Sequence, residues 1–380
     1  MIYLDYSATT KCDENILDTY VKVSRDYFAN SSSEYSIAYQ VKELIDTATQ
    51  QIADLFSVKK SEIIYTSSAT ESNNTAIKGM SFYENRDKLI ITSTKIHSSI
   101  KETLKYMESL GYKVYFLKND NSGRIDLDDL KNNIFNASLV TIPLISSEIG
   151  VIENLEEIKK VVKLNPRCLL HIDATQAVGK INFNMEDIDM LSLSAHKLFG
   201  IKNSALLIKK EKVNLIPLIH GGISTTRFRS GTADQASIVC MAKTLRKALE
   251  NIDEKYKYVE ELKLDLIKFF KKYDRVVLNS KEYTSPYILN LSFLGVKIES
   301  FIHKMEENKV YLSTKSACSN DKLLSDEVYS LYNDEQRAKT SFRISLSYKT
   351  TREEIEEFKN IFDKVYKSFI IIINFESHPE

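Results

Sequence analysis

Apolar runs of strand length alternate with longer amphipathic stretches between residues 62 and 210. Short apolar runs bounded by turn signals are typical of buried strands, and apolar residues three and four positions apart are typical of helices. The predicted strands are Glu62–Thr66, Lys88–Thr92, Lys113–Leu117, Leu139–Ile145, Cys168–Ile172, Met190–Ser194 and Ala205–Ile208. The predicted helices are Glu14–Tyr27, Ala38–Phe56, Thr70–Phe82, His97–Leu110 and Leu155–Leu164. The alternation indicates βαβ units, and therefore an α/β domain around a mostly parallel sheet.

The order of elements changes in the second half of the chain. A charged stretch, Ile238–Tyr273, keeps helical spacing and is expected to be a connector that leaves the sheet domain. The predicted order after it is strand Tyr287–Phe293, helix Glu299–Glu307, strands Val310–Ser313 and Phe342–Ser347, and helix Thr351–Phe369. We therefore expect a large domain over residues 13–250 and a smaller α+β domain that combines residues 1–12 with residues 251–380.

Composition and charge exclude several classes of protein. The 380 residues are 43% hydrophobic, which is enough for sizeable cores, and 52 basic residues balance 52 acidic ones. No global basic field attracts nucleic acid or an anionic membrane. The most apolar run, Phe369–Phe375, is far shorter than the roughly 20 residues of a membrane span, and we expect a strand or helix end there. The N-terminus lacks the pattern of an export signal, so we expect a cytoplasmic protein.

The four cysteines are scattered and lack the close pairs of a zinc site, so we expect no metal. Cys318 differs from the others because it lies in a polar stretch between Lys315 and Lys322. Neighbouring cations favour the reactive thiolate, which makes Cys318 the candidate nucleophile. Glycine is scarce, with 10 residues, so many tight turns must be built from other residues.

A hydroxyl-rich turn, residues 66–73, connects a predicted strand to a predicted helix. The free N–H groups and the dipole at a helix N-terminus hold phosphate well. An ordinary capping box of Ser67 or Ser68 with Glu71 explains the same residues. The turn alone does not decide between the two interpretations.

Two charged residues follow predicted strands. Asp173 ends a strand at the sheet edge where doubly wound folds bind ligands, and it suits either a cationic ring nitrogen or a helix cap. Lys197 follows the strand that ends at Ser194, and a desolvated lysine there can form a Schiff base, although most lysines are solvated. A phosphate anchor, an acid and a Schiff-base lysine together are what pyridoxal phosphate requires.

Three further features suit an anionic or flat ligand. His97 begins a predicted helix, where its ring can stack on a cofactor or simply cap the helix. Arg343 interrupts an apolar strand, and a buried arginine needs an anion such as a substrate carboxylate. Residues 221–232 form a basic loop with two adjacent glycines, but the chain contains no dinucleotide-binding G-x-G-x-x-G.

These motifs together resemble, over nearly the whole chain, the cysteine desulfurases of the NifS and IscS type within the class V aminotransferase fold. The matching stretches are Tyr3–Thr10, Ala69–Ser72, Glu148–Val151, Asp173–Gln176, His196–Lys197, Arg229–Thr232, Ser316–Cys318 and Arg343–Leu346. The resemblance implies the pyridoxal-phosphate-dependent transferase fold type I. It also implies a large domain with a mostly parallel seven-stranded sheet and a small domain that carries a mobile cysteine loop.

The resemblance implies a role for each site residue. Lys197 would bind pyridoxal phosphate covalently, Asp173 would pair with its ring nitrogen, and His97 would stack on its ring. Gln176 would contact the phenolic oxygen, and Arg343 would bind the carboxylate of L-cysteine. The implied phosphate contacts are Ala69, Thr70, Ser194, His196 and, from the partner subunit of a homodimer, Thr232.

The implied activity converts L-cysteine to L-alanine. Lys197, Cys318 and His97 would be catalytic, with the sulfur passing to Cys318 as a persulfide. The sulfur would then pass to an acceptor protein, such as an iron–sulfur scaffold or a tRNA thiolation enzyme. The alternatives are a selenocysteine or cysteine lyase on the same scaffold, and a non-catalytic platform that binds a sulfur carrier.

The chain departs from the family pattern in its site. Ser147 stands where the family has an asparagine that contacts the phenolic oxygen of the cofactor. Ser68 and Asn203 are among several residues that stand where the family has glycine. We interpret the chain as a diverged member of the family.

Overall fold

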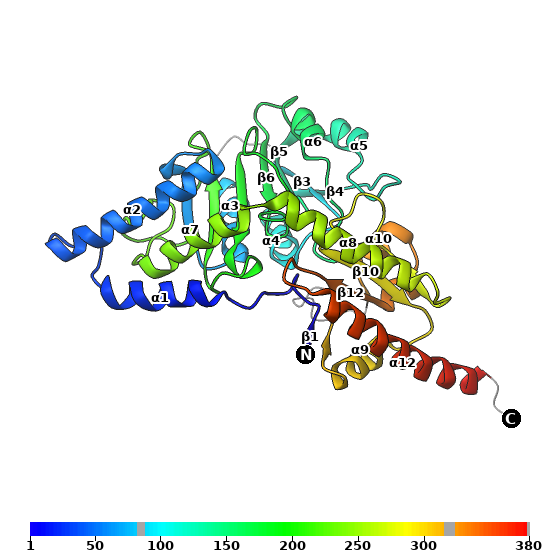
Figure 1. The fold of residues 1–380 in the computed structure, drawn as a ribbon. Coiled ribbons are helices and arrows are strands. Elements are labelled where there is room, and N and C mark those ends of the chain that lie inside the picture. The colour runs from blue at the N-terminus through cyan, green and yellow to red at the C-terminus, as the bar shows by residue number, and fades with distance from the viewer. Residues whose placement is uncertain (82–87, 315–323, 378–380) are drawn as a thin grey trace.

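The computed structural model describes residues 1–81, 88–314 and 324–377, with side chains to residue 371. Figure 1 shows a larger part built around a central sheet and a smaller part that ends in the long helix α12. The N-terminus lies beside the smaller part, so the first residues cross from there to helix α1 (Glu14–Asp26) of the larger part.

The central sheet has seven strands. Their order is β2 (Ile63–Thr66), β8 (Ala205–Lys209), β7 (Met190–Ser194), β6 (Leu169–Asp173), β5 (Ala137–Pro143), β3 (Leu89–Ser93) and β4 (Lys113–Leu117). Strand β8 is antiparallel to both of its neighbours, and the remaining pairs are parallel. The predicted α/β class with a mostly parallel seven-stranded sheet is therefore confirmed.

Helices cover both faces of this sheet, and the strands β5, β6, β7 and β8 are buried along their whole length. Along β3, Ile90 packs in one hydrophobic cluster and the next residue, Ile91, packs in another. The first cluster includes helices α3 (Ala69–Ser81) and α4 (Ser98–Ser109). The second includes α2 (Ser36–Phe56), α5 (Leu127–Asn133), α6 (Leu155–Val162) and α7 (Gln235–Leu249). The burial on both faces explains why the strands read as continuous apolar runs.

The predicted helical connector over Ile238–Tyr273 is interrupted once. The structure has two helices there, α7 and α8 (Ile252–Phe270), separated at Glu250 and Asn251. Asn251 has φ 53°, in the left-handed region, which ends one helical path and starts another. The apolar spacing continues through the break, so the spacing alone did not reveal it.

The smaller part has its own hydrophobic cluster, to which Ile2 and Leu4 contribute. It contains the antiparallel sheet β12 (Ser341–Ser345), β10 (Ile288–Phe293) and β9 (Val276–Leu278), and the parallel pair β1 (Ile2–Tyr3) and β11 (Val310–Tyr311). Its helices are α8, α9 (Ile298–Glu307), α10 (Asp326–Tyr332), α11 (Glu335–Lys339) and α12 (Arg352–Ser377). The domain boundaries at residues 12 and 250 stay a prediction.

Residues other than glycine build several tight turns, as the low glycine count predicts. Asn203, which stands where the family has glycine, has φ 56°, and Phe199 has φ 62°. A left-handed backbone is uncommon for a bulky residue, and here two hydrogen bonds hold Phe199. Its N–H donates to Oγ1 of Thr10, and its carbonyl accepts from the N–H of Asp13.

The run Phe369–Phe375 lies near the end of helix α12, so it is a helix end and not a strand. None of the helices in the described residues is both long and apolar enough to cross a membrane.

Candidate active site

Eight of the predicted site residues line one cavity of about 190 Å³ at the carboxyl ends of the parallel strands. Most come from the turns that follow β2, β3, β6 and β7, and one comes from strand β12 of the smaller part. The eight are Ala69, Thr70, His97, Asp173, Gln176, His196, Lys197 and Arg343. The sheet edge and the smaller part thus form the site together.

Lys197 lies in a short 3₁₀ turn, Ala195–Lys197, directly after β7. Its amine donates a hydrogen bond to the carbonyl of Ala8 at 2.8 Å and another to the carbonyl of Ser7. The N-terminal segment is tied to the same turn, because the N–H of Thr10 donates to the carbonyl of His196 at 2.9 Å. The residues after β1 therefore fix the position of the lysine amine.

His196 also lines the cavity, and its Nδ1 lies 3.1 Å from the hydroxyl of Thr9. Burial, reinforced by the positive charge of Lys197, lowers the pKa of His196 to about 4. The imidazole is therefore neutral at physiological pH and serves as a neutral hydrogen-bonding group beside the lysine.

Asp173 is buried at the end of β6 and accepts two hydrogen bonds. Its Oδ1 accepts from the N–H of Thr175 at 3.0 Å, and its Oδ2 accepts from the amide of Asn73 at 2.9 Å. The two donors fix the orientation of the carboxylate. The bond to Thr175 is a contact within the local turn. Asp173 therefore stabilises the turn after β6 and also lines the cavity.

His97 caps helix α4, because its Nδ1 accepts from the N–H of Ser99 at 3.1 Å. Burial lowers the pKa of His97 below its ordinary value, although the charge of Asp173 acts in the opposite direction. The ring is therefore a neutral flat surface in the cavity wall. His97 therefore caps helix α4 and lines the cavity at the same time.

The hydroxyl-rich turn places Ala69 and Thr70 in the first turn of α3. The first N–H groups of a helix lack intrahelical acceptors and suit an anion. The carboxylate of Glu71 accepts from the N–H and hydroxyl of Ser67, both at 2.7 Å, and from Nε of Arg229 at 3.0 Å. A capping interaction thus shapes the turn and leaves its first residues facing the cavity.

Gln176 is held by groups on both sides. Its Nε2 donates to the carbonyl of Ser7 at 3.0 Å, and its Oε1 accepts from the amine of Lys180 at 2.6 Å. Burial, together with the positive charges of Lys197 and Arg343, lowers the pKa of Lys180 to about 7. The only signal for Lys180 in the sequence is its position four residues after Gln176.

Arg343 extends from β12 into the cavity wall, and its side chain is 2% exposed. Its Nη1 donates to the carbonyl of Ser147 at 2.6 Å, and its Nη2 donates to Oδ1 of Asp5 at 2.8 Å. Its Nε is buried without a hydrogen-bond partner among the described residues. A buried N–H without an acceptor is costly, so the guanidinium retains capacity for an anionic ligand.

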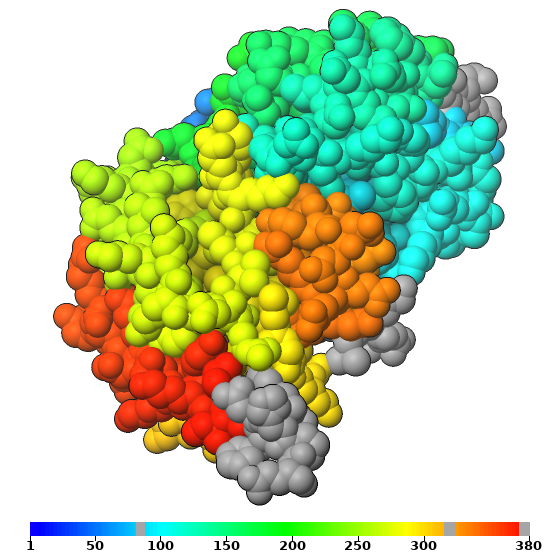
Figure 2. Space-filling model, turned by 90° about the vertical axis from the view of Figure 1, so that its right-hand side faces the viewer, coloured from blue at the N-terminus to red at the C-terminus, as the bar shows by residue number. Residues whose placement is uncertain are grey.

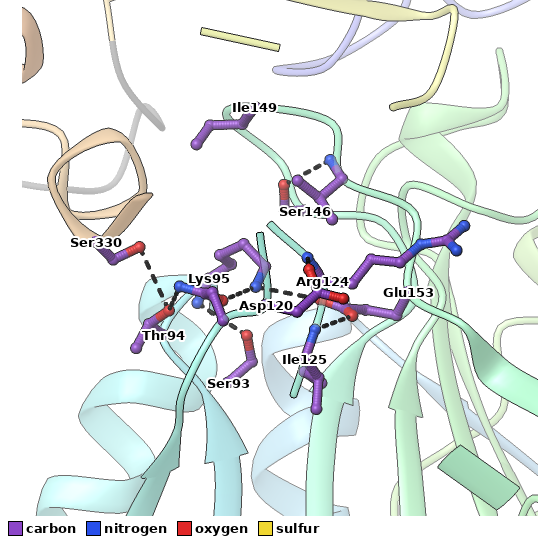
Figure 3. A network of polar contacts seen from close by, with 12 residues as sticks. Ser93, Thr94, Lys95, Asp120, Arg124, Ile125, Ser146, Ile149, Glu153 and Ser330 are labelled. Carbon is purple, nitrogen blue, oxygen red and sulfur yellow. Dashed lines mark hydrogen bonds and ion pairs between the residues drawn. The ribbon is translucent and has the colours of Figure 1, made fainter. Parts of the chain in front are cut away.

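Lys95 is a cavity residue that the sequence analysis did not select. Figure 3 shows it within a buried polar network next to Glu153, Arg124 and Ile125. Its amine lies 3.3 Å from Oε1 of Glu153, whose Oε2 accepts from the N–H of Ile125 at 2.8 Å. The preceding Thr94 contacts Ser330 of α10 at 3.4 Å. The network therefore links the cavity wall to the smaller part.

Two buried acids lie where helix α10 packs on the loop after β5. Oε2 of Glu327 accepts from the N–H of Ile149 at 3.1 Å, and the hydroxyl of Ser325 donates to Oε2 of Glu148 at 2.6 Å. Figure 2 shows the outer surface of the same region, where the orange segment of α10 and α11 lies beside the cyan part of the chain. Burial and the nearby charge of Glu148 raise the pKa of Glu327 to about 8.

Two predicted site residues do not line the cavity, and a third lies outside the described residues. Ser194 is buried at the end of β7, Thr232 is exposed, and neither lines the cavity that the described residues form. Their phosphate contacts stay predictions, since the one from Thr232 is expected in the partner subunit. Cys318 lies outside the described residues. Within those residues, no three His, Cys, Asp or Glu side chains gather in a way that could hold a metal ion.

Comparison with known proteins places the chain among enzymes of one type. Residues 2–358 match the family model described as aminotransferase class-V. The chain is 35% identical over 379 residues to a NifS/IcsS protein homolog of Lactobacillus delbrueckii subsp. bulgaricus, covering 97% of this chain and 98% of that protein. It is 36% identical over 365 residues to a cysteine desulfurase IscS of Buchnera aphidicola, covering 93% and 90% of the two chains.

Solved structures give the same result. A NifS-like protein superposes with a TM-score of 0.90 at 29% identity, covering 97% of this chain and 99% of the other. A structure described as SspA in complex with cysteine superposes with a TM-score of 0.80 at 29% identity, covering 92% of this chain and 100% of the other. The similarity therefore extends through both parts of the fold.

Proposed function

The chain belongs to the class-V aminotransferase family, and on that premise we propose that it is a cysteine desulfurase. It converts L-cysteine to L-alanine and transfers the sulfur atom to an enzyme cysteine. The observation that carries the proposal is a single cavity lined by an amine, an acid and an arginine: Lys197, Asp173 and Arg343. These are the three groups that the reaction requires at one place.

The donor set of the cavity fits pyridoxal phosphate. The first turn of α3 suits the phosphate, Asp173 suits a protonated ring nitrogen, and Lys197 suits the aldehyde carbon. His97 offers a neutral ring face, and Gln176 offers an amide beside it. When bound there, the cofactor supplies an electron sink for the bonds to the substrate's Cα and Cβ.

The protein's own groups have separate tasks. Arg343 binds the substrate carboxylate, which fills the hydrogen-bonding capacity left at its buried Nε. The amine of Lys197 removes the proton from Cα and later returns a proton to the substrate carbon. Asp173 is held in place by its bonds to Asn73 and Thr175. The neutral His196 next to the lysine does not add a competing positive charge.

Cys318 takes the sulfur in a step that needs no external oxidant. The Cys318 thiolate attacks the substrate sulfur, an S–S bond forms and the Cβ–S bond breaks. The sulfur is oxidised to the sulfane level while Cβ is reduced from a thiol carbon to the methyl group of alanine. The sum is cysteine plus enzyme thiol giving alanine plus enzyme persulfide, in which atoms and electrons balance.

The persulfide is passed to an acceptor protein, of the iron–sulfur scaffold or tRNA thiolation class. The enzyme acts as a cytoplasmic homodimer in which Thr232 completes the phosphate site of the partner subunit. These assignments rest on the family resemblance.

The test measures alanine formation from L-cysteine by the purified protein, with Cys318→Ser as the decisive variant and Cys12→Ser as the matched control. A desulfurase loses nearly all alanine formation in Cys318→Ser in the absence of added thiol, and keeps it in Cys12→Ser. Unchanged turnover in Cys318→Ser overturns the proposal in favour of a lyase. The absence of turnover in every form, with cofactor bound, favours a binding platform.

A further inference from the structure

We propose that Asn73 is a positioning residue that connects Asp173 to His97 through Ser99, and that this chain of hydrogen bonds holds the carboxylate and the imidazole, with the proton of the ring on Nε2, in fixed orientations. The inference rests on the proposed function, because Asp173 and His97 are the groups expected at the ring of the cofactor. Neither Asn73 nor Ser99 was among the predicted site residues. Both are fully or almost fully buried.

The amide of Asn73 lies between the two elements that carry the site groups. Its Nδ2 is 2.9 Å from Oδ2 of Asp173 on β6 and 2.9 Å from Oγ of Ser99 on α4. An ionised carboxylate only accepts hydrogen bonds, so the nitrogen of the amide must face Asp173. Both amide hydrogens are thereby used, one toward each element.

The hydroxyl of Ser99 connects Asn73 to His97. Because Oγ of Ser99 accepts from Asn73, its own hydrogen is available to Nδ1 of His97, which is 2.9 Å away. The N–H of Ser99 donates to the same Nδ1 at 3.1 Å. Two donors at Nδ1 exclude a proton there, so the neutral ring carries its hydrogen on Nε2.

The environment of Asn73 supports a role beyond packing. Its Oδ1 is buried and has no hydrogen-bond partner in the described part of the chain. A buried amide oxygen without a donor costs free energy. The orientation that satisfies Asp173 and Ser99 is kept at the expense of Oδ1. Burial lowers the pKa of His97, in agreement with a neutral ring.

The test compares Asn73→Ala and Ser99→Ala with Ser99→Thr, which keeps the hydroxyl. Asn74→Ala is the matched control, since Asn74 is the half-buried neighbour whose amide donates to the carbonyl of Thr70 at 2.9 Å. The main readout is the ¹⁵N NMR spectrum of the histidine side chains, recorded with and without cofactor and assigned with His97→Gln. A second readout is the separate measurement of kcat and KM for L-cysteine.

We expect the protonation midpoint of His97 to rise by about 0.5 to 1 pH unit in Asn73→Ala and Ser99→Ala, while the N–H of Ser99, which still donates to Nδ1, keeps the neutral ring in the Nε2–H form. Ser99→Thr and Asn74→Ala should keep the wild-type spectrum. In Asn73→Ala, kcat should fall about 10- to 100-fold while KM changes little, because the groups are displaced rather than removed.

An unchanged protonation midpoint of His97 in folded Asn73→Ala and Ser99→Ala overturns the inference. If Asn73→Ala does not fold, the comparison of Ser99→Ala with Ser99→Thr decides. The NMR readout in the cofactor-free protein does not depend on turnover. Failure of the proposed function would therefore appear as missing alanine formation with an intact His97 response.

Discussion

Nη2 of Arg343 lies 2.8 Å from Oδ1 of Asp5, so the guanidinium expected to bind the substrate carboxylate already contacts a carboxylate of the same chain. Asp5 is 19% exposed and belongs to the N-terminal segment, whereas Arg343 is on β12. Asp5 thus neutralises part of the positive charge of Arg343 to which a substrate carboxylate would bind. It also orients the guanidinium.

Asp5→Asn should lower the KM for L-cysteine about 3- to 10-fold. Asparagine keeps an oxygen that accepts from Arg343 but removes the competing negative charge. Steady-state kinetics checks the prediction, and Arg343→Gln provides the opposite case with a KM raised about 100-fold. A KM in Asp5→Asn that equals or exceeds the wild-type value contradicts the role assigned to Asp5.

Ser147→Asn should shift the pH titration of the cofactor's visible absorbance to a midpoint about 1 unit lower. Ser147 lines the cavity and has a shorter side chain than asparagine, with a single hydrogen to donate. A longer amide can donate to the phenolic oxygen and stabilise its ionised form. The substitution leaves the backbone carbonyl that accepts from Arg343 in place. Identical midpoints in the two proteins would count against this account.

Glu327→Gln should remove one contribution to the pH dependence of the free energy of unfolding. The pKa of Glu327 is raised from 4.5 to about 8, so between these values the native state holds a proton that the unfolded chain has lost. Stability therefore falls as pH rises through this window, by at most about 1.4 kcal/mol per pH unit. Glu148 and Lys95 are the charged groups that act on Glu327 in this packing.

Urea unfolding at pH 5, 6.5 and 8 measures the effect. The difference in unfolding free energy between Glu327→Gln and wild type should grow in favour of the variant as pH rises. Asp326→Asn is the control, because the side chain of Asp326 is 51% exposed and pairs with Lys101 at the surface. Parallel pH profiles for wild type and Glu327→Gln would refute a protonated Glu327.

Lys180→Met should remove a contribution to the free energy of unfolding that rises with pH, opposite in sign to that of Glu327. The pKa of Lys180 is lowered from 10.5 to about 7, so between these values the unfolded chain binds one proton more than the native state. Wild-type stability should rise with pH over this range by up to about 1.4 kcal/mol per unit, and Lys180→Met should flatten that rise. Unfolding between pH 7 and 9 tests this, with the 58% exposed Lys105 replaced by Met as control. Equal slopes in wild type and Lys180→Met would exclude a neutral buried amine.

The sequence was sufficient for the elements whose signal is local. Strands such as β4 and β7 agree with their predicted ranges, because their apolar runs are bounded by polar turns. The antiparallel direction of β8 was not predictable, since an apolar run carries no direction. The break at Asn251 was missed because the apolar spacing runs through it.

For the site, the sequence identified the groups that follow strands, such as Asp173 and Lys197. It did not identify Asn73 or Lys180, whose importance depends on which elements pack side by side. Asn73 reaches Asp173 across 100 residues of chain. Asp5 lay within a matching stretch, but its contact with Arg343 spans 338 residues and needs the three-dimensional structure.

The central claim is that the amine of Lys197 binds pyridoxal phosphate. Borohydride reduction of the cofactor-loaded protein, followed by peptide mass spectrometry, locates the attachment directly. We predict a phosphopyridoxyl group on the peptide that contains Lys197 and its absence in Lys197→Ala. Modification of Lys95, the other lysine that lines the cavity of the described residues, in place of Lys197 would contradict the account, as would the absence of any modified lysine.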